Sequence, residues 1–149
     1  MKTAILVKVL AEKRIQDDIA ARLKQILGEV KFVQVASTEM GPFKNDRGID
    51  ISLDIIANGT PWKLFVEVKS SGEPRIARGA IQQLLSVGSN REGQYGLLGA
   101  PYVSPETQKI CKESGVGFID LAGNCSLEFD KIFIKCSEFP KELLINNFP

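Results

Sequence analysis

The stretch from Arg47 to Ser71 (RGIDISLDIIANGTPWKLFVEVKSS) constrains the fold most, because it has the pattern of two β-strands joined by a two-residue turn. Asn58-Gly59 lies between two apolar-rich runs, and both residue types tolerate the positive φ angles of a type I′ hairpin turn. If these two residues form the turn, Ala57 faces Thr60 and each further pair lies one step outward. The sequence therefore predicts an antiparallel hairpin with a defined register.

This register places two acids opposite each other. Counting outward from the turn, Asp50 faces Glu67, and Lys69 shares their face because side chains alternate with a period of two residues. Directly opposed residues have Cβ atoms about 4.5–5.5 Å apart, and like charges so placed are destabilising. Two explanations stay open: a solvated strand end partly neutralised by Lys69, or a divalent cation held between the acids. Hard cations such as Mg²⁺ bind carboxylate oxygens and keep several water molecules.

Asp54 is the alternative to Asp50 as the first acid of such a site. In the same register Asp54 faces Lys63, so a cross-strand ion pair is its simplest role. Asp54 also lies four residues along the strand from Asp50, which is about 13 Å at about 3.3 Å per residue. A turn longer than two residues, with Pro61 nearby, would shift the register, so the choice of Asp50 depends on the hairpin count.

The other face of the predicted hairpin is apolar, and we expect it to face a hydrophobic core. Its members on the first strand are Ile49, Ile51, Leu53 and Ile55, and those on the second are Leu64, Val66 and Val68.

Composition excludes several kinds of catalytic centre. The 149 residues include no histidine, which excludes serine–histidine and cysteine–histidine centres and histidine-bound metals. Three cysteines, an odd number without CxxC spacing, favour reduced thiols over a disulfide framework or a zinc site. The net charge of +1 provides no global basic field, so nucleic-acid binding would need a local patch. We expect a single domain over residues 1–149 and, because no apolar run approaches a membrane span, a cytoplasmic protein.

The rest of the chain alternates between helical and strand patterns. Apolar steps of three and four residues predict a helix over 11–27, and residues 3–10 fit either a strand or the first turns of that helix. Further helices are predicted over 74–87 and 105–114, and a polar loop over 37–48. The strand-like segments outside the hairpin are 30–36, 95–100, 116–121, 125–129 and 132–136. This order predicts an α/β fold, an αβα sandwich around a mixed central sheet.

The charged face of the hairpin also resembles a known family. Asp50, then a turn, then Glu67-Val68-Lys69 in FVEVKSS is similar to the Asp…Glu-x-Lys core of the PD-(D/E)xK phosphodiesterase superfamily, which has the restriction-endonuclease-like fold. Ile49 stands where the name-giving proline would be, a position that varies in such proteins. The stretches EPRIARGAIQQLL, APYVSPETQ and GVGFIDLAGNCSLEF resemble a group of prokaryotic nuclease-like domains of this superfamily. The resemblance covers roughly residues 30–136.

The resemblance implies a nuclease domain that hydrolyses phosphodiester bonds in DNA with Mg²⁺ or Mn²⁺. Asp50 and Glu67 would bind the metal together with the main-chain carbonyl of Val68, and Lys69 would stabilise charge on the phosphate or position the attacking water. The expected partners are nucleic acid, a winged-helix domain that often follows in this group, and a second copy, since members frequently act as dimers. The alternative is a catalytically weak or inactive nucleic-acid-binding or regulatory module with the same fold.

Further residues are candidates for supporting roles. Gln82 and Gln83 lie on the helix after the motif, where many superfamily members carry a supporting Gln, Lys or Glu; a polar helix face explains them equally well. Arg75 and Arg78 are candidates for phosphate contacts, which position nucleic acid without reading its sequence. The remaining candidates, which scattered solvated charges also explain, are Arg91 and Lys63 as phosphate contacts and Glu12 and Glu39 as acids.

Asp120 and Asn124, in the segment FIDLAGN, form a second polar cluster. They lie between two predicted strands, and Asx side chains stabilise turns by hydrogen bonds to nearby backbone amides. We therefore expect a structural role for both.

Overall fold

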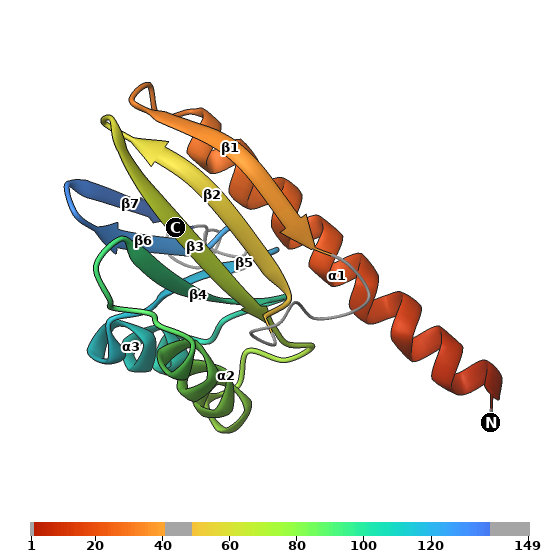
Figure 1. The fold of residues 1–149 in the computed structure, drawn as a ribbon. Helices are drawn as coiled ribbons and strands as arrows, with labels where there is room; N and C mark the ends of the chain where they lie inside the picture. The colour runs from red at the N-terminus through yellow and green to blue at the C-terminus, as the bar shows by residue number, and fades with distance from the viewer. Residues whose placement is uncertain (1, 41–48, 138–149) are drawn as a thin grey trace, which may run out of the picture.

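The computed structural model describes residues 2–40 and 49–137, which form three helices and seven strands (Figure 1). The helices are α1 (Lys2–Gly28), α2 (Pro74–Ser86) and α3 (Pro105–Ser114). The strands are β1 (Val33–Met40), β2 (Ile51–Ala57), β3 (Thr60–Val68), β4 (Gln94–Ala100), β5 (Gly117–Asp120), β6 (Cys125–Phe129) and β7 (Ile132–Cys136). Among these helices, none is long and apolar enough to cross a membrane.

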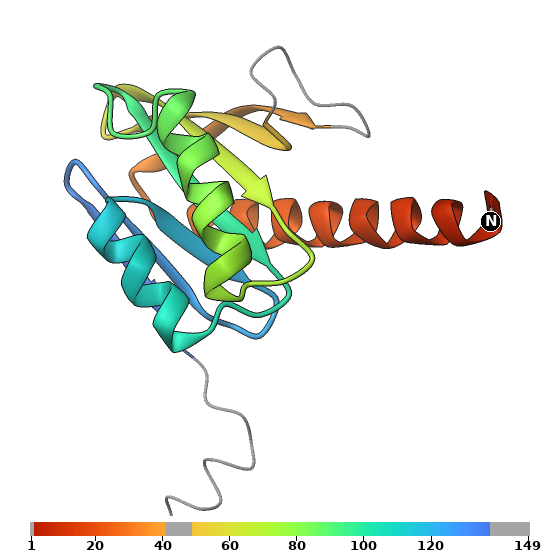
Figure 2. The same ribbon diagram turned by 90° about the horizontal axis from the view of Figure 1, so that it is seen from below.

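The seven strands form one mixed sheet in which neighbours in sequence are also neighbours in space. The pairs β3–β4 and β4–β5 are parallel, and the other pairs are antiparallel. Parallel strands need a crossover connection, which α2 supplies for the first pair and α3 for the second. Figures 1 and 2 show α1 on one face of the sheet and α2 and α3 together on the other. The predicted α/β sandwich is confirmed.

Each face of the sheet has its own hydrophobic core. The first core lies between α1 and the sheet and includes Ile19, Leu23, Ile51 and Leu53. The second lies under α2 and α3, and its strand residues include Phe65 and Leu98. The crossover helices α2 and α3 therefore also cover part of the hairpin face that carries the acids, at Phe65.

The structure corrects the predicted position of Ile49. This residue was expected to share the face of Ile51, but it is buried in the second core, on the side of α2 and α3. Ile49 precedes the first paired residue of β2, so the alternation of a strand does not extend to it.

Two predicted boundaries near the N-terminus also change. Residues 3–10 belong to α1, which is continuous with the helix predicted over 11–27. The predicted strand 30–36 begins at Val33 and extends to Met40, into the predicted loop 37–48. The strand is longer because β1 pairs with β2 as far as Met40 opposite Ile51, across a bulge between Val35 and Ser37. Residues 41–48 lie outside the described part of the chain.

Candidate active site

The hairpin turn forms at the predicted residues. Asn58 and Gly59 have φ angles of 50° and 81°, and the pairing runs from Ala57 opposite Thr60 to Ile51 opposite Val66. The predicted register is therefore confirmed over the whole of β2.

Asp54 makes the predicted ion pair with Lys63. The Lys63 Nζ lies 3.3 Å from the Asp54 Oδ1, and the hydroxyl of Ser37 on β1 donates to the Asp54 Oδ2 at 2.9 Å. Both charged side chains are substantially exposed. Asp54 thus belongs to a polar surface cluster on β1–β3, away from the strand end where Asp50 lies.

Asp50 occupies the end of the β2–β3 ladder. Beyond the pair Ile51–Val66, the Asp50 Oδ2 accepts a hydrogen bond from the main-chain N–H of Val68 at 2.8 Å. The side chain thus takes the place that a backbone carbonyl would have if the ladder continued. Because N–H and C=O of one residue point to the same side of a paired strand, the Val68 carbonyl is also directed toward the β2 side.

Glu67 and Lys69 flank Val68 in the sequence. Because side chains alternate along a strand, both lie on the face of the sheet opposite to the Val68 side chain. The Glu67 side chain is only 1% exposed, and the Lys69 Nζ lies 3.8 Å from its Oε1. Burial of a carboxylate is costly unless a cation offsets it, and the Lys69 ammonium provides one. The Lys69 side chain is 36% exposed, so its charge also reaches solvent. All of these groups lie at the carboxyl end of β3, which runs parallel to β4, and ligands of α/β sheets bind at such ends.

The donor set fits a hard divalent cation. Two carboxylates and a main-chain carbonyl are oxygen ligands, and Mg²⁺ characteristically takes one or two carboxylates and fills its other positions with water and phosphate. Within residues 2–40 and 49–137, no group of three or more His, Cys, Asp or Glu side chains gathers to hold a metal.

Four further predicted residues lie on α2: Arg75, Arg78, Gln82 and Gln83. Arg78 and Gln82 line an open groove of about 480 Å³ between α2 and α3, with Ile110 and Ser114 opposite. Gln82 lies eight residues into α2, about 12 Å along the helix axis from Pro74. Arg75, in the first turn of α2, is exposed, and Gln83 is half-buried. A supporting role of Gln82 or Gln83 at the carboxylates stays a prediction.

Of the two further acids, Glu39 is exposed on β1 opposite Ser52. Glu12 is exposed on α1. Arg91 is exposed as well, in the loop before β4.

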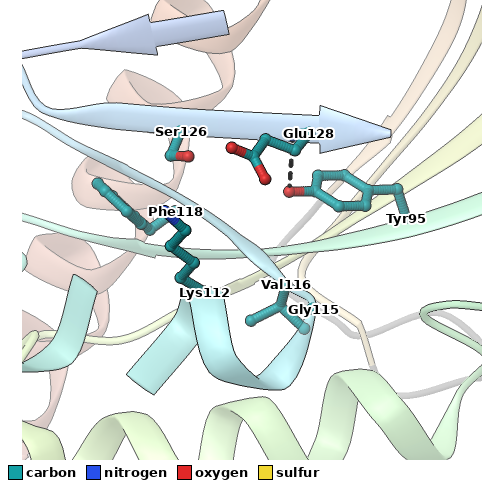
Figure 3. A pocket seen from close by; sticks show the side chains of 7 residues that line it. All are labelled: Tyr95, Lys112, Gly115, Val116, Phe118, Ser126 and Glu128. Carbon is teal, nitrogen blue, oxygen red and sulfur yellow. Dashed lines mark hydrogen bonds between the residues drawn. The ribbon is translucent and has the colours of Figure 1, made fainter. Parts of the chain in front are cut away.

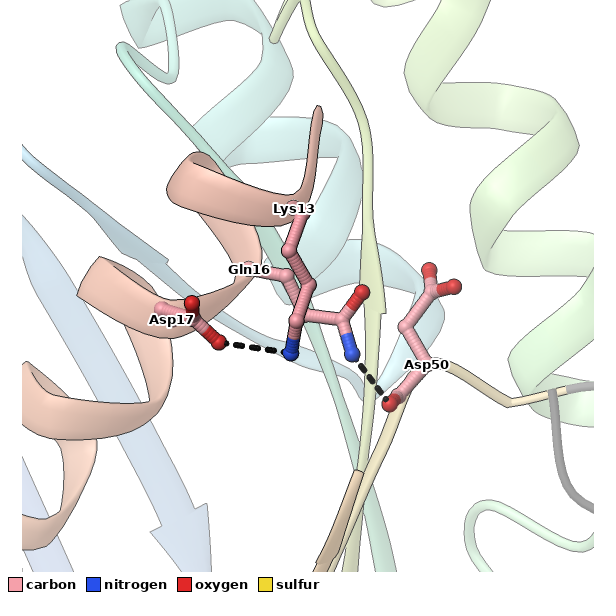
Figure 4. Close-up of polar contacts among 4 residues, drawn as sticks. All are labelled: Lys13, Gln16, Asp17 and Asp50. Atoms are coloured by element: carbon pink, nitrogen blue, oxygen red, sulfur yellow. Dashed lines mark hydrogen bonds and ion pairs between the residues drawn. The ribbon is translucent and has the colours of Figure 1, made fainter. Parts of the chain in front are cut away.

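One contact of the site was absent from the sequence prediction. The Gln16 Nε2, on α1, donates to the main-chain oxygen of Asp50 at 3.0 Å (Figure 4). Gln16 is 8% exposed. Its signal in the sequence is a polar side chain at a position that continues the apolar stripe of Ile19 and Leu23, but nothing local identifies its partner.

A small cavity elsewhere does not compete as an active site (Figure 3). It measures about 40 Å³, which suffices for water but not for a nucleotide, and Tyr95, Lys112, Phe118 and Glu128 are among its lining residues. The Tyr95 hydroxyl accepts a hydrogen bond from the Glu128 N–H at 3.0 Å. Burial raises the pKa of Tyr95 to about 12, so the phenol stays neutral.

The polar cluster at Asp120 is structural, as expected. The buried carboxylate accepts from the N–H groups of Val103, Ala122 and Asn124 and from the Asn124 Nδ2, at 2.8–3.0 Å. These bonds tie the turn after β5 to the loop before α3.

Comparison with known proteins adds little. No protein-family model and no curated protein matches the chain. Among solved structures, it is similar to the apo form of EndoMS, with a TM-score of 0.39 and 15% sequence identity, over 76% of this chain. The chain spans about half the length of that protein, 47%. Similarity at this level assigns the chain neither to a family nor to an activity.

Proposed function

We propose that this protein is a metal-dependent nuclease of the PD-(D/E)xK type, which hydrolyses phosphodiester bonds in DNA. The observation that carries the proposal is the 2.8 Å hydrogen bond from the Val68 N–H to the Asp50 Oδ2. It brings one carboxylate to the strand end where Glu67 and Lys69 lie, as the predicted motif requires.

Each group has a role in this proposal. Asp50, Glu67 and the Val68 carbonyl would hold Mg²⁺ or Mn²⁺, which when bound polarises a phosphodiester and lowers the pKa of a bound water. Lys69 keeps a positive charge at the site and is exposed enough to approach a phosphate oxygen. A cation preorganised there stabilises the negative charge that develops during hydrolysis. This chemistry needs no histidine, in agreement with the composition.

DNA binding would use exposed cations near the site. Arg75 is exposed in the first turn of α2, which follows Lys69 after a short loop. A guanidinium at this place would contact the phosphate backbone and position the substrate without reading its sequence.

The test is cleavage of plasmid, branched and single-stranded DNA with Mg²⁺ or Mn²⁺. We expect Glu67→Gln and Lys69→Ala each to lower the cleavage rate by about 100-fold or more, because each removes a charge that acts on the reacting phosphate. Asp54→Asn is the matched control, since it changes a carboxylate of the same hairpin, on β2, that pairs with Lys63 away from Glu67 and Lys69.

Two results would contradict the proposal. Cleavage that survives both Glu67→Gln and Lys69→Ala would come from a contaminating enzyme. DNA binding by the wild type without cleavage at millimolar Mn²⁺ would instead favour a catalytically inactive nucleic-acid-binding module.

A further inference from the structure

The middle of α1 carries a buried amide that contacts the candidate site. The Gln16 Nε2 donates to the main-chain oxygen of Asp50, 34 residues later in the sequence, at 3.0 Å. A buried amide without a partner is costly, so this contact is worth more than a solvated one. Figure 4 shows the Asp50 carboxylate directed away from Gln16, so the amide holds the backbone and leaves the carboxylate to face β3.

The helix that carries Gln16 is fixed against the same strands. Ile19, one turn further along α1, is fully buried. A Cβ at Gly99 of β4 would lie 3.0 Å from the Ile19 Cγ2, so the helix packs closely on β4 at a residue without a side chain. The Gly99 oxygen in turn accepts a hydrogen bond from the Lys69 N–H at 2.8 Å. The position of Gln16 is thus defined relative to the end of β3.

Asp50 needs such support because the strand ladder does not include it. The β2–β3 pairing ends at Ile51, one residue after Asp50. Contacts from two other elements hold Asp50 at its two ends: Gln16 at the main-chain carbonyl and the Val68 N–H at the carboxylate.

We infer that Gln16 is a positioning residue for Asp50. By holding the Asp50 backbone against α1, it keeps the carboxylate on the Val68 N–H, at the end of β3 where a divalent cation would be bound. This role rests on the proposed function, since it concerns the same site.

Gln16→Met tests the inference, because it keeps the length of the side chain and removes the N–H donor. Lys13→Met is the matched control: it breaks the exposed ion pair between the Lys13 Nζ and the Asp17 Oδ1, 2.9 Å apart, on the same stretch of α1 (Figure 4). Two quantities are measured in the full chain: amide hydrogen exchange by NMR, at Val68 and at Leu97 as a reference in β4, and the affinity for Mn²⁺ by calorimetry.

In Gln16→Met we expect faster exchange at Val68 than in the wild type, with exchange at Leu97 little changed. We also expect about two- to tenfold weaker Mn²⁺ binding, the effect of one lost hydrogen bond. Lys13→Met should match the wild type in both quantities.

Three results would overturn the inference: unchanged exchange at Val68, equal acceleration at Leu97, or faster exchange at Val68 with unchanged Mn²⁺ affinity. The first would show that Gln16 does not hold Asp50, and the second that it acts on general stability. If the wild type itself bound no Mn²⁺, the proposed function would fail. Exchange at Val68 would still decide whether Gln16 holds Asp50.

Discussion

At the scale of single residues, the candidate site was predictable where it depends on local periodicity. The alternation of a strand and one Asn-Gly turn are enough to place Asp54 opposite Lys63, which the structure confirms. The same count predicts Asp50 opposite Glu67, one step beyond the paired residues. Gln16 was not predictable, because its contact with Asp50 depends on how α1 packs on the sheet. Gln82 lines the groove with α3, and its supporting role at the site stays a prediction.

Burial distinguishes the three thiols and predicts their reactivity. Burial raises the pKa of both Cys111 and Cys125 to about 12, whereas Cys136 is partly exposed. The thiolate is the reactive form of cysteine, so both inaccessibility and protonation protect Cys111 and Cys125. In the native protein we expect Ellman's reagent to react first with Cys136, and with the other two after addition of denaturant. Reaction of Cys111 at the rate of Cys136 would show that the second core is open.

The Asp120 carboxylate should contribute strongly to stability. Asp120→Ala removes the acceptor of four hydrogen bonds and leaves buried N–H groups without it, so we expect a loss of about 3 kcal/mol or more in the free energy of unfolding. Asp17→Ala breaks an exposed ion pair and should change the same quantity by less than about 1 kcal/mol. Urea unfolding of the two variants compares them directly, and similar losses would contradict a structural role for Asp120.

At the scale of helices and strands, boundaries set by local signals were predicted best. The helix α3 begins after Ser104, whose hydroxyl accepts from the Thr107 N–H at 3.3 Å, and ends at Gly115 with φ 75°. Both signals are local in the sequence. The end of β1 was missed because it depends on its partner β2. The burial of Phe65, on the face of the hairpin opposite to its apolar side, likewise depends on the cover by α2 and α3.

Two glycine substitutions should change the stability of the protein in opposite directions, because Gly99 lies in close packing between α1 and β4 and Gly79 lies in open space on α2. In Gly99→Ala the new Cβ would meet the Ile19 Cγ2 at 3.0 Å and the Val66 Cγ1 at 3.2 Å, so we expect a loss of about 1–3 kcal/mol in the free energy of unfolding. Gly79 lies in α2, exposed and with nothing within 4 Å of a new Cβ. Gly79→Ala should therefore stabilise the protein by up to about 1 kcal/mol. Thermal unfolding measures both, and a stable Gly99→Ala variant would contradict the packing.

At the scale of the whole molecule, the order of elements predicted an α/β sandwich, and the structure has this architecture. The two-sided core follows from the crossover helices that parallel strands require. The sequence pattern does not predict which partners the protein binds, because association depends on its surface and not on hydrophobic periodicity. The homodimer and the winged-helix partner therefore stay predictions.

The buried phenol and thiols predict how stability depends on pH. The folded state raises the pKa of Tyr95 from 10.0, and of Cys111 and Cys125 from 9.0, to about 12 in each case. A raised pKa favours the neutral form, so this stabilisation is fully present below about pH 9 and is lost as the pH rises toward 12. We expect urea unfolding to show a falling free energy above about pH 9, less steeply in Tyr95→Phe. A free energy that stays constant up to about pH 11 would contradict the burial of these groups.

If Asp50 and Glu67 together hold a divalent cation, a calorimetric titration with Mn²⁺ detects it. We expect one Mn²⁺ per chain, with binding greatly weakened in Asp50→Asn and in Glu67→Gln and retained in Asp54→Asn. No binding at millimolar Mn²⁺, or binding that both Asp50→Asn and Glu67→Gln leave unchanged, would contradict it.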